Sequence, residues 1–473
     1  MLGHNIRSDL AMACRVLAAH RAIDLWGHLS LRIPRSEHIL VTPRFGRSVL
    51  PRGIREADML VVDLDGRVIE GTGELPRQVA ADLALYRADP AAGACICFAP
   101  RFAMAAAIAG FRLLPMTHME SFIAYATGTW TAEELADTPA AAADLAGLLK
   151  SSVAVQQPGI GAWVKGESLL HALLAAYHLE YLGQQNSVAA SLDVATLCEE
   201  ADSQKMWRQF AGWDHYVEFF HSLDPGPLDH PVAARLAAAG DDADAARRIR
   251  ERTSLACKAL WERDTLVAFL EHVSHRLPQD DRMVISAAKN FSHVEPADLC
   301  VTDLRGNWID GPKPPGYKFF HAQILAERPD VQAIVHTHDL YGRSYALSRH
   351  ELVPMYRVGL DVALRPLPVY PRCDLMVDAD VRRDAIDLLG QGPIVHEACH
   401  GTDFVADTLE EALVDAIQRE QFLEMDHLAR RFGTVAPMPT RRERVAEVEA
   451  PAEDWWWFHT AEIGAPRRSV AGL

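Results

Sequence analysis

The sequence predicts an α/β protein that contains one domain twice, and two observations predict this class. Ala13-Cys-Arg-Val-Leu17 returns as Ala256-Cys-Lys-Ala-Leu260, and the run 57–66 returns as the run 297–306. Within each copy, short strand-forming runs alternate with amphipathic helical stretches. The spacing between matching residues stays near 240 (57 and 297, for example), which indicates a tandem duplication of a domain of roughly 190 residues.

Each copy contains the same expected elements in the same order. A helix opens the copy, short strands and a second helix follow, then a strand, and a last amphipathic helix closes it. The first and second helices are expected over 9–21 and 80–88 in copy one, and over 253–263 and 320–327 in copy two. Turn signals stand at Asp65-Gly66 and Arg305-Gly306, and a capping turn at 407–411 precedes the last helix.

These patterns divide the chain into four segments. Copy one is expected over 1–190, a partly helical linker over 191–248, copy two over 249–435, and a Trp-rich tail over 436–473. The tail contains Asp454-Trp-Trp-Trp-Phe-His459, and three consecutive Trp residues cannot all face one core. We expect this segment to pack across a subunit contact, because aromatic anchors favour interfaces; closing over an aromatic substrate is the alternative.

The composition is that of a soluble globular protein and excludes several kinds of partner. The 473 residues are 49% hydrophobic and 23% charged, with a net charge of −17. Such a charge argues against nucleic acid and anionic membranes as partners. The eight cysteines show no disulfide-scaffold spacing, and no apolar run is long enough to span a membrane. A cytoplasmic location is therefore expected, with reduced thiols.

A histidine pair in copy two predicts a metal site. His336 and His338 stand in a strand-forming run, where residues i and i+2 point to the same face. His400-Gly401 follows about sixty residues later and could supply a third imidazole. Three nitrogen ligands leave positions open for water or substrate, as catalytic metal sites do.

Across nearly all of both copies the sequence resembles the class II aldolase/adducin family. The motifs that carry the resemblance lie in copy two, at 272–278, 297–306, 321–330, 331–338 (Val-Gln-Ala-Ile-Val-His-Thr-His) and 400–409 (His-Gly-Thr-Asp-Phe-Val-Ala-Asp-Thr-Leu). The resemblance implies two tandem three-layer α/β/α domains, each with a central, mainly antiparallel sheet. It also implies a divalent metal on His336, His338 and His400. Family members usually form rings of four, so a homo-oligomer is expected, either a dimer or a tetramer of tandem chains.

Copy one departs from the family at every ligand. Cys97-Phe-Ala99 aligns with His336-Thr-His338, and Ile160 is the preferred match to His400. Copy one is therefore expected to be a degenerate domain without metal and with a structural role.

Copy two departs from the family's sugar-phosphate aldolases at the acid/base. They have a Glu four residues before the His that matches His321, and here that residue is Tyr317. Their phosphate-binding loops are also missing, since 311–316 reads Gly-Pro-Lys-Pro-Pro-Gly. We therefore expect a small-molecule substrate that is not phosphorylated. Tyr317 and His321 are the candidate catalytic residues, because a nearby metal could lower a tyrosine pKa and His321 lies one helical turn away.

Three basic residues are candidates for binding a substrate carboxylate: Arg276, Lys318 and Arg357. With this site, the sequence favours a divalent-metal-dependent carbon–carbon lyase, a decarboxylase or retro-aldolase that uses Zn, Mn or Co. Two alternatives stay open. Relatives described as non-haem iron oxygenases suggest Fe(II) and O₂ chemistry, and adducin suggests a non-catalytic scaffold.

Overall fold

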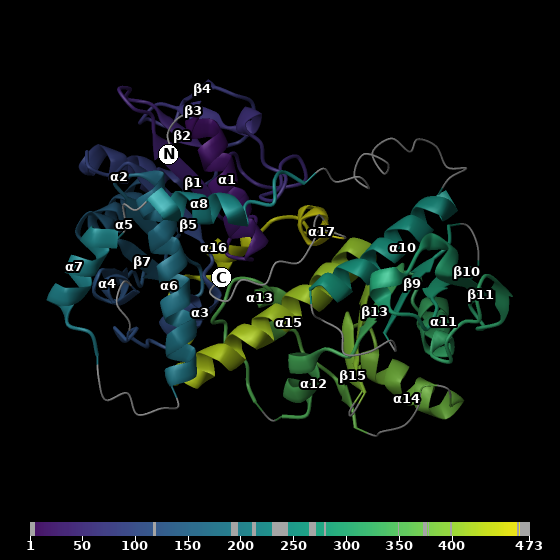
Figure 1. Ribbon diagram of the computed structural model, residues 1–473. Helices are drawn as coiled ribbons and strands as arrows, with labels where there is room; N and C mark the ends of the chain where they lie inside the picture. Colours follow the sequence, from purple (N-terminus) through teal and green to yellow (C-terminus); the bar gives the residue numbers. More distant parts are fainter. Residues whose placement is uncertain are drawn as a thin grey trace.

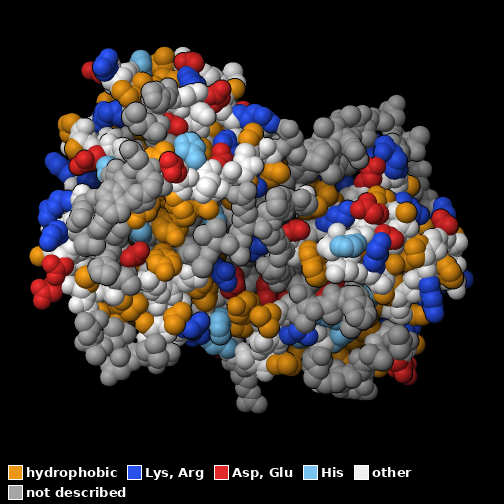
Figure 2. Space-filling model, viewed as in Figure 1, with side chains coloured by type: hydrophobic (Ala, Val, Ile, Leu, Met, Phe, Trp, Pro, Cys, Tyr) orange, Lys and Arg blue, Asp and Glu red, His pale blue; other side chains and the backbone are white. Residues whose placement is uncertain are grey.

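The computed structural model describes the chain apart from residues 1–4, 117–119, 191–196, 211–213, 229–244, 264–270, 279–280, 349, 372–375, 377, 398–399, 461–462 and 464–473. The two copies form two lobes, joined by a long helix, α15, that runs from the second copy into the first (Figure 1). Figure 2 shows positive and negative side chains interspersed over the visible face of both lobes rather than separated by sign.

Copy one follows the expected order of elements. Its helices are α1 (Ile6–Ala19), α2 (Val79–Ala88), α3 (Arg101–Ile108), α4 (Glu120–Tyr125), α5 (Pro139–Ser151) and α6 (Leu169–Ala189). Its strands are β1 (His28–Arg32), β2 (Ile39–Val41), β3 (Leu60–Val62), β4 (Val68–Glu70), β5 (Ala94–Phe98), β6 (Thr127–Thr129), β7 (Ala154–Gln157) and β8 (Gly161–Gly166). Two helices follow it, α7 (Glu200–Phe210) and α8 (Asp214–Leu223).

Copy two repeats this order. Its strands are β9 (His272–Arg276), β10 (Arg282–Ser286), β11 (Leu299–Asp303), β12 (Trp308–Asp310), β13 (Ala333–Thr337), β14 (Val369–Tyr370), β15 (Ile394–Glu397) and β16 (Thr402–Ala406). Its helices are α10 (Ala245–Glu262), α11 (Lys318–Glu327), α12 (Leu340–Ala346), α13 (Leu360–Leu364), α14 (Ala379–Leu389) and α15 (Leu409–Phe432), and the tail adds α16 (Arg442–Ala446) and α17 (Ala452–Thr460).

The two sheets have the same topology, which confirms the duplicated α/β fold. Their strand orders are β4-β3-β2-β1-β5-β8-β7-β6 and β12-β11-β10-β9-β13-β16-β15-β14. All neighbouring strands are antiparallel except the last pair of each sheet, which is parallel. In each copy, separate apolar clusters cover the two faces of the sheet, which gives the expected three layers.

Local sequence signals explain where several elements begin and end. Gly66 and Gly306 adopt left-handed φ values of 83° and 82°, which glycine tolerates without steric cost. The hydroxyl of Thr408 accepts a hydrogen bond from the amide of Glu411 and caps α15, as the capping turn predicts. The boundaries expected at 190, 248 and 435 stay predictions, although α6 ends at Ala189 and α15 at Phe432. No helix in the described ranges is long and apolar enough to cross a membrane.

An apolar cluster between the copies holds the lobes together. Side chains from α3 and from Ile160 in copy one pack there against 355–358, α15 and the tail. The Trp run also contacts both copies: Trp455 is buried in a core of copy one and Trp456 in a core of copy two. Neighbouring Trp residues of α17 thus face different cores, and the contact they span lies within one chain.

Arg357 makes the most buried ion pair between the copies. It is 3% exposed, pairs with Asp24 of copy one, and donates from Nε to the carbonyl of Ile160 at 2.8 Å. Its guanidinium also lies over the ring of Trp26, at 4.4 Å from the centroid.

We expect Arg357→Ala to lower the free energy of unfolding by about 3 kcal/mol, because it removes a buried guanidinium and leaves the carboxylate of Asp24, which is 14% exposed, without its ion-pair partner. Chemical denaturation measures this value. The matched control is Arg442→Ala, which breaks the exposed pair with Asp361 and should cost less than about 1 kcal/mol. Equal effects of the two variants would contradict the assignment.

Candidate metal centre

Three imidazoles converge in copy two. His336 stands in β13 and His338 directly after it, while His400 occupies the turn before β16. The Nε2 atoms of His336 and His338 lie 3.1 Å apart, and one nitrogen of His400 lies within 4.8 Å of both. Two nitrogen ligands of one tetrahedral ion, each about 2.1 Å from it, lie about 3.4 Å apart. The three side chains therefore fit a single metal ion.

Each imidazole has a carboxylate behind it. Asp403 Oδ1 lies 3.2 Å from Nδ1 of His336, and Glu397 Oε2 lies 2.8 Å from Nδ1 of His400. Glu271 Oε1 is 3.9 Å from Nδ1 of His338. The hydrogen bond between Glu397 and Nδ1 of His400 fixes the tautomer in which Nε2 presents its lone pair to a metal, while Asp403 and Glu271 lie behind His336 and His338 at longer distances.

The electrostatics keep His338 and His400 neutral, which is the form that binds metal. Burial, followed by the nearby His336 ring, lowers the pKa of His338 to about 3 and that of His400 to about 4. Burial and the neighbouring Asp403 raise the pKa of Glu397 well above its ordinary value. Burial alone favours neutral Asp403, but His336 and then His321 hold its pKa well below the ordinary range. One of these two carboxyl groups therefore carries the negative charge.

Asp403 lies at the centre of this cluster of side chains. It lies on β16 directly opposite His336 on β13 and is fully buried. The hydroxyl of Tyr317 donates to its Oδ2 at 3.5 Å, and Nε2 of His321 lies 3.4 Å from its Oδ1. Ser274 on β9 holds the other ring nitrogen of His321 at 2.8 Å.

The sequence of the chain matches a known protein family in both copies. The model of the class II aldolase and adducin N-terminal domain matches residues 8–186 and again residues 251–427. The chain belongs to this family. Each match covers one copy, so the chain carries two class II aldolase domains in tandem, as the sequence predicts.

Three curated relatives show the range of names in this family. The chain is 29% identical over 185 residues to 3,4-dihydroxyphthalate decarboxylase of Arthrobacter keyseri, covering 36% of this chain and 73% of that protein. It is 24% identical to L-fuculose phosphate aldolase of Methanococcus vannielii, covering 37% and 94%. It is 30% identical to 4-hydroxy-3-prenylphenylpyruvate oxygenase/4-hydroxy-3-prenylbenzoate synthase of Streptomyces roseochromogenus subsp. oscitans, covering 33% and 58%.

The two candidate catalytic residues occupy different places in this class II aldolase domain. The ring of Tyr317 faces the metal ligands, with its centroid 4.4 Å from that of His336 and 5.4 Å from that of His400. His321 is fully buried, with Nδ1 hydrogen-bonded to Ser274 and Nε2 facing Asp403 Oδ1 at 3.4 Å. His321 therefore lies against Asp403, on the side away from Ser274, whereas the ring of Tyr317 borders the three imidazoles.

The structure does not bring the three candidate basic residues to the histidines. Arg276 donates to backbone carbonyls at the end of α11, among them those of Leu325 and Arg328. Lys318 lies over the ring of Phe319 at 4.7 Å, and Arg357 is committed to the contact with copy one. The type of a basic side chain does not reveal which partner it contacts in the folded chain. Arg276, Lys318 and Arg357 are therefore not part of the proposed site.

Arg343 on α12 is the basic residue that sequence reasoning missed. Its charge is among the smaller causes that lower the pKa of His338, His400 and His396, and its Nε donates at 3.2 Å to the carbonyl of Asp339, the residue after His338. The three carboxylates were also missed. Asp403 and Glu397 each stand three residues from His400, a spacing that could have pointed to them. Glu271 has no comparable signal.

In copy one, a different residue stands at each position that is equivalent to a residue of the centre. Cys97 occupies the position of His336, since both lie opposite the first residue of the equivalent strand, His28 or His272. The replacements, given as copy one for copy two, are Cys97 for His336, Ala99 for His338, Ile160 for His400, Trp163 for Asp403, Gln157 for Glu397, Gly27 for Glu271, Gln78 for Tyr317 and Asp82 for His321. Among the residues that the structure describes, copy one offers no cluster of three metal-ligating side chains.

Asp403→Asn is expected to weaken the affinity for a divalent metal by between about 10- and 100-fold, because the neutral amide no longer supports His336. Equilibrium dialysis against zinc measures this loss. The control is Asp426→Asn, at a buried carboxylate that pairs with Arg430 outside the centre. The control should change stability without changing metal affinity, and equal affinities of the two variants would contradict the role of Asp403.

Proposed function

We propose that the chain is a divalent-metal-dependent lyase that breaks a carbon–carbon bond in a non-phosphorylated hydroxy-acid or hydroxy-carbonyl compound. Decarboxylation is the preferred reaction. One observation carries this proposal. Tyr317, rather than a carboxylate, is the proton-bearing side chain that lies against the three histidines. Zn, Mn or Co would suit three imidazole nitrogens.

The residues of the centre fit this chemistry. A divalent ion held by His336, His338 and His400 would stabilise the negative charge that develops on a substrate oxygen as the bond breaks. Loss of CO₂ leaves the bonding electron pair on the substrate carbon, which must then take up a proton. Tyr317 is placed to deliver that proton and to regain one from water, while Asp403 accepts its hydrogen bond and orients the hydroxyl.

The relatives support the lyase reading. Two of the three named above are a decarboxylase of a dihydroxy aromatic acid and an aldolase, and both names describe carbon–carbon cleavage. Removal of CO₂ needs no initial abstraction of a proton from carbon, so it tolerates the lack of a carboxylate base at position 317. Cleavage of an aldol needs a base for the hydroxyl proton, which a tyrosine serves less readily at its ordinary pKa.

A second candidate function is an oxygenase reaction with Fe(II) and O₂. The relative from Streptomyces roseochromogenus subsp. oscitans carries that name, and three nitrogen ligands with open positions also suit iron. An adducin-like scaffold is less well supported, because the complete ligand set and its carboxylates have a use only in binding metal.

The first experiment is metal analysis of the purified chain, beside assays of a panel of aromatic and aliphatic hydroxy-acids with and without O₂. About one Zn, Mn or Co per chain, absent from a His336→Ala/His338→Ala variant, with CO₂ release independent of O₂, is the expected result. Aldehyde release instead would favour the retro-aldolase. Iron together with O₂ uptake would favour the oxygenase reaction over the lyase reaction. Absence of metal from both proteins would favour the non-catalytic scaffold.

Arg343 is the residue that we propose to bind the substrate carboxylate. Arg343→Gln is expected to raise KM about tenfold while the metal content stays unchanged, because one charged hydrogen bond is lost. Steady-state kinetics measure the effect. Arg383→Gln, at an exposed arginine on α14 paired with Glu327, is the control and should leave KM unchanged. A fall in kcat without a change in KM would contradict this role.

Assembly and location stay predictions from the sequence. We propose a homo-oligomer made of two or four tandem chains, which light scattering of the purified protein measures directly, and a cytoplasmic location.

A further inference from the structure

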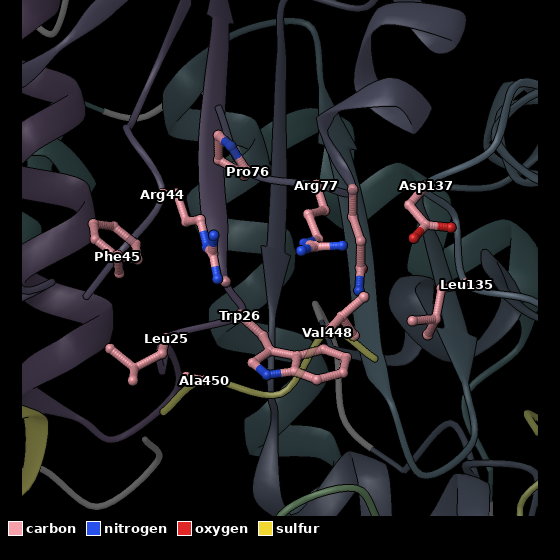
Figure 3. A pocket seen from close by; sticks show the side chains of 12 residues that line it. Leu25, Trp26, Arg44, Phe45, Pro76, Arg77, Leu135, Asp137, Val448 and Ala450 are labelled. Carbon is pink, nitrogen blue, oxygen red and sulfur yellow. The ribbon is translucent and has the colours of Figure 1, made fainter. Parts of the chain in front are cut away.

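Copy one contains a pocket of its own. It holds about 500 Å³ of space, part of it open to solvent. Figure 3 shows the side chains of Arg44 and Arg77 extending into the space beside the indole of Trp26. Phe45 and Leu135, which are 3% and 1% exposed, supply further apolar wall.

This pocket lies where the metal centre lies in copy two. Gln78, which lines it, occupies the position of Tyr317, since each stands immediately before the equivalent helix. Gly27, also in the lining, occupies the position of Glu271. The Sγ of Cys97, at the position of His336, lies 3.9 Å from Oε1 of Gln78. Copy one therefore has other residues in place of the three imidazoles, and a pocket bordered by residues at two equivalent positions, Gln78 and Gly27.

The charges at this pocket favour an anion. Arg77 is exposed, and none of the described carboxylates lies within ion-pair distance of its guanidinium. Arg44 pairs with Glu74 at 3.0 Å, but that glutamate is 77% exposed, and such a pair is readily exchanged for another anion. Asp137, the acid in the lining, pairs with Arg444 at 2.8 Å, and the same guanidinium also pairs with Glu134 and Glu447.

We propose that the degenerate copy is a binding site for a small organic anion with an apolar body, such as an aromatic or short aliphatic carboxylate. The carboxylate binds between Arg77 and Arg44, and the apolar part packs on Trp26 and Leu135. The site needs no metal. It is independent of the proposed reaction, because no residue of the centre in copy two takes part.

The tail closes one side of this pocket, so a ligand there touches both copy one and the tail. Val448 and Ala450 of the tail line the pocket. Between them, Glu449 accepts a hydrogen bond from Nε1 of Trp455 at 2.7 Å. The ring of Trp26, which also lines the pocket, contacts the guanidinium of Arg357 from copy two. A bound anion thus adds to the contact between copy one and the tail and stabilises the folded chain.

The test uses benzoate as the probe and the full-length His336→Ala variant as the protein, so that the metal centre cannot account for binding. Calorimetry is expected to show benzoate binding to this variant, and binding of the neutral isostere benzamide at least about tenfold weaker. Adding Arg77→Gln should weaken benzoate about tenfold, because a charged hydrogen bond to the carboxylate is lost. Arg67→Gln, at another exposed arginine of copy one, should leave benzoate binding unchanged.

The outcomes separate this site from the proposed reaction. Absence of benzoate binding to the His336→Ala variant overturns the proposal, whatever the activity of the unaltered protein. Binding that is equal for benzoate and benzamide, or unaffected by Arg77→Gln, also overturns it. Binding to the variant that depends on Arg77 supports it, even if the second copy proves to have no lyase activity.

Discussion

Replacing His336 with alanine is expected to abolish stoichiometric metal binding and to lower kcat/KM for the lyase substrate by about a thousandfold, the equivalent of several kcal/mol of charge stabilisation. His336 is fully buried, its Nε2 lies 3.1 Å from Nε2 of His338, and its Nδ1 lies 3.2 Å from Asp403 Oδ1. Elemental analysis and steady-state kinetics on the same preparation measure the two effects.

Two further variants make this result specific. Cys97→Ala alters the equivalent position of copy one and should leave metal content and kcat/KM unchanged. His400→Ala should cause the same loss as His336→Ala with less effect on folding, since the side chain of His400 is 27% exposed. Full activity with metal in either histidine variant would show that the three imidazoles are not the ligand set.

Tyr317→Phe is expected to lower kcat by about a hundredfold or more while the metal content stays at the level of the unaltered protein. The phenyl ring keeps the packing against His336 and Phe320, but the hydroxyl that supplies the proton is lost. Single-turnover CO₂ release separates bond cleavage from protonation. An unchanged kcat would mean that water or another group supplies the proton.

Much of the fold could be predicted from the sequence because the chain repeats itself. Matching runs such as 57–66 and 297–306 indicate one domain twice, and glycine turns and a capping Thr at 408 fix local geometry. Two helices are longer than expected at their starts: α1 begins at Ile6 rather than residue 9, and α10 at Ala245 rather than 253. The apolar periodicity fades there, while the backbone continues the helix.

The candidate site was only partly predictable, for a physical reason. His336 and His338 lie two residues apart on one strand, a relation that is visible in the sequence. Asp403 comes from a different strand and meets His336 only through sheet register, which a single sequence does not show. Arg357 illustrates the opposite case, because its chemistry suits a substrate carboxylate but it is buried and its ion-pair partner is Asp24 of copy one.

The comparison of the two copies has an evolutionary consequence. Arg32 and Arg276 make the same contacts to carbonyls at the end of the neighbouring helix, so the scaffold persists in both. At the former metal position, however, Trp163 is fully buried where Asp403 would stand. Restoring the three histidines alone would leave them without the supporting carboxyl groups, each of which contributes about 10- to 100-fold in metal affinity. A return to metal binding in copy one therefore requires several substitutions together, whereas a task without metal requires none of them.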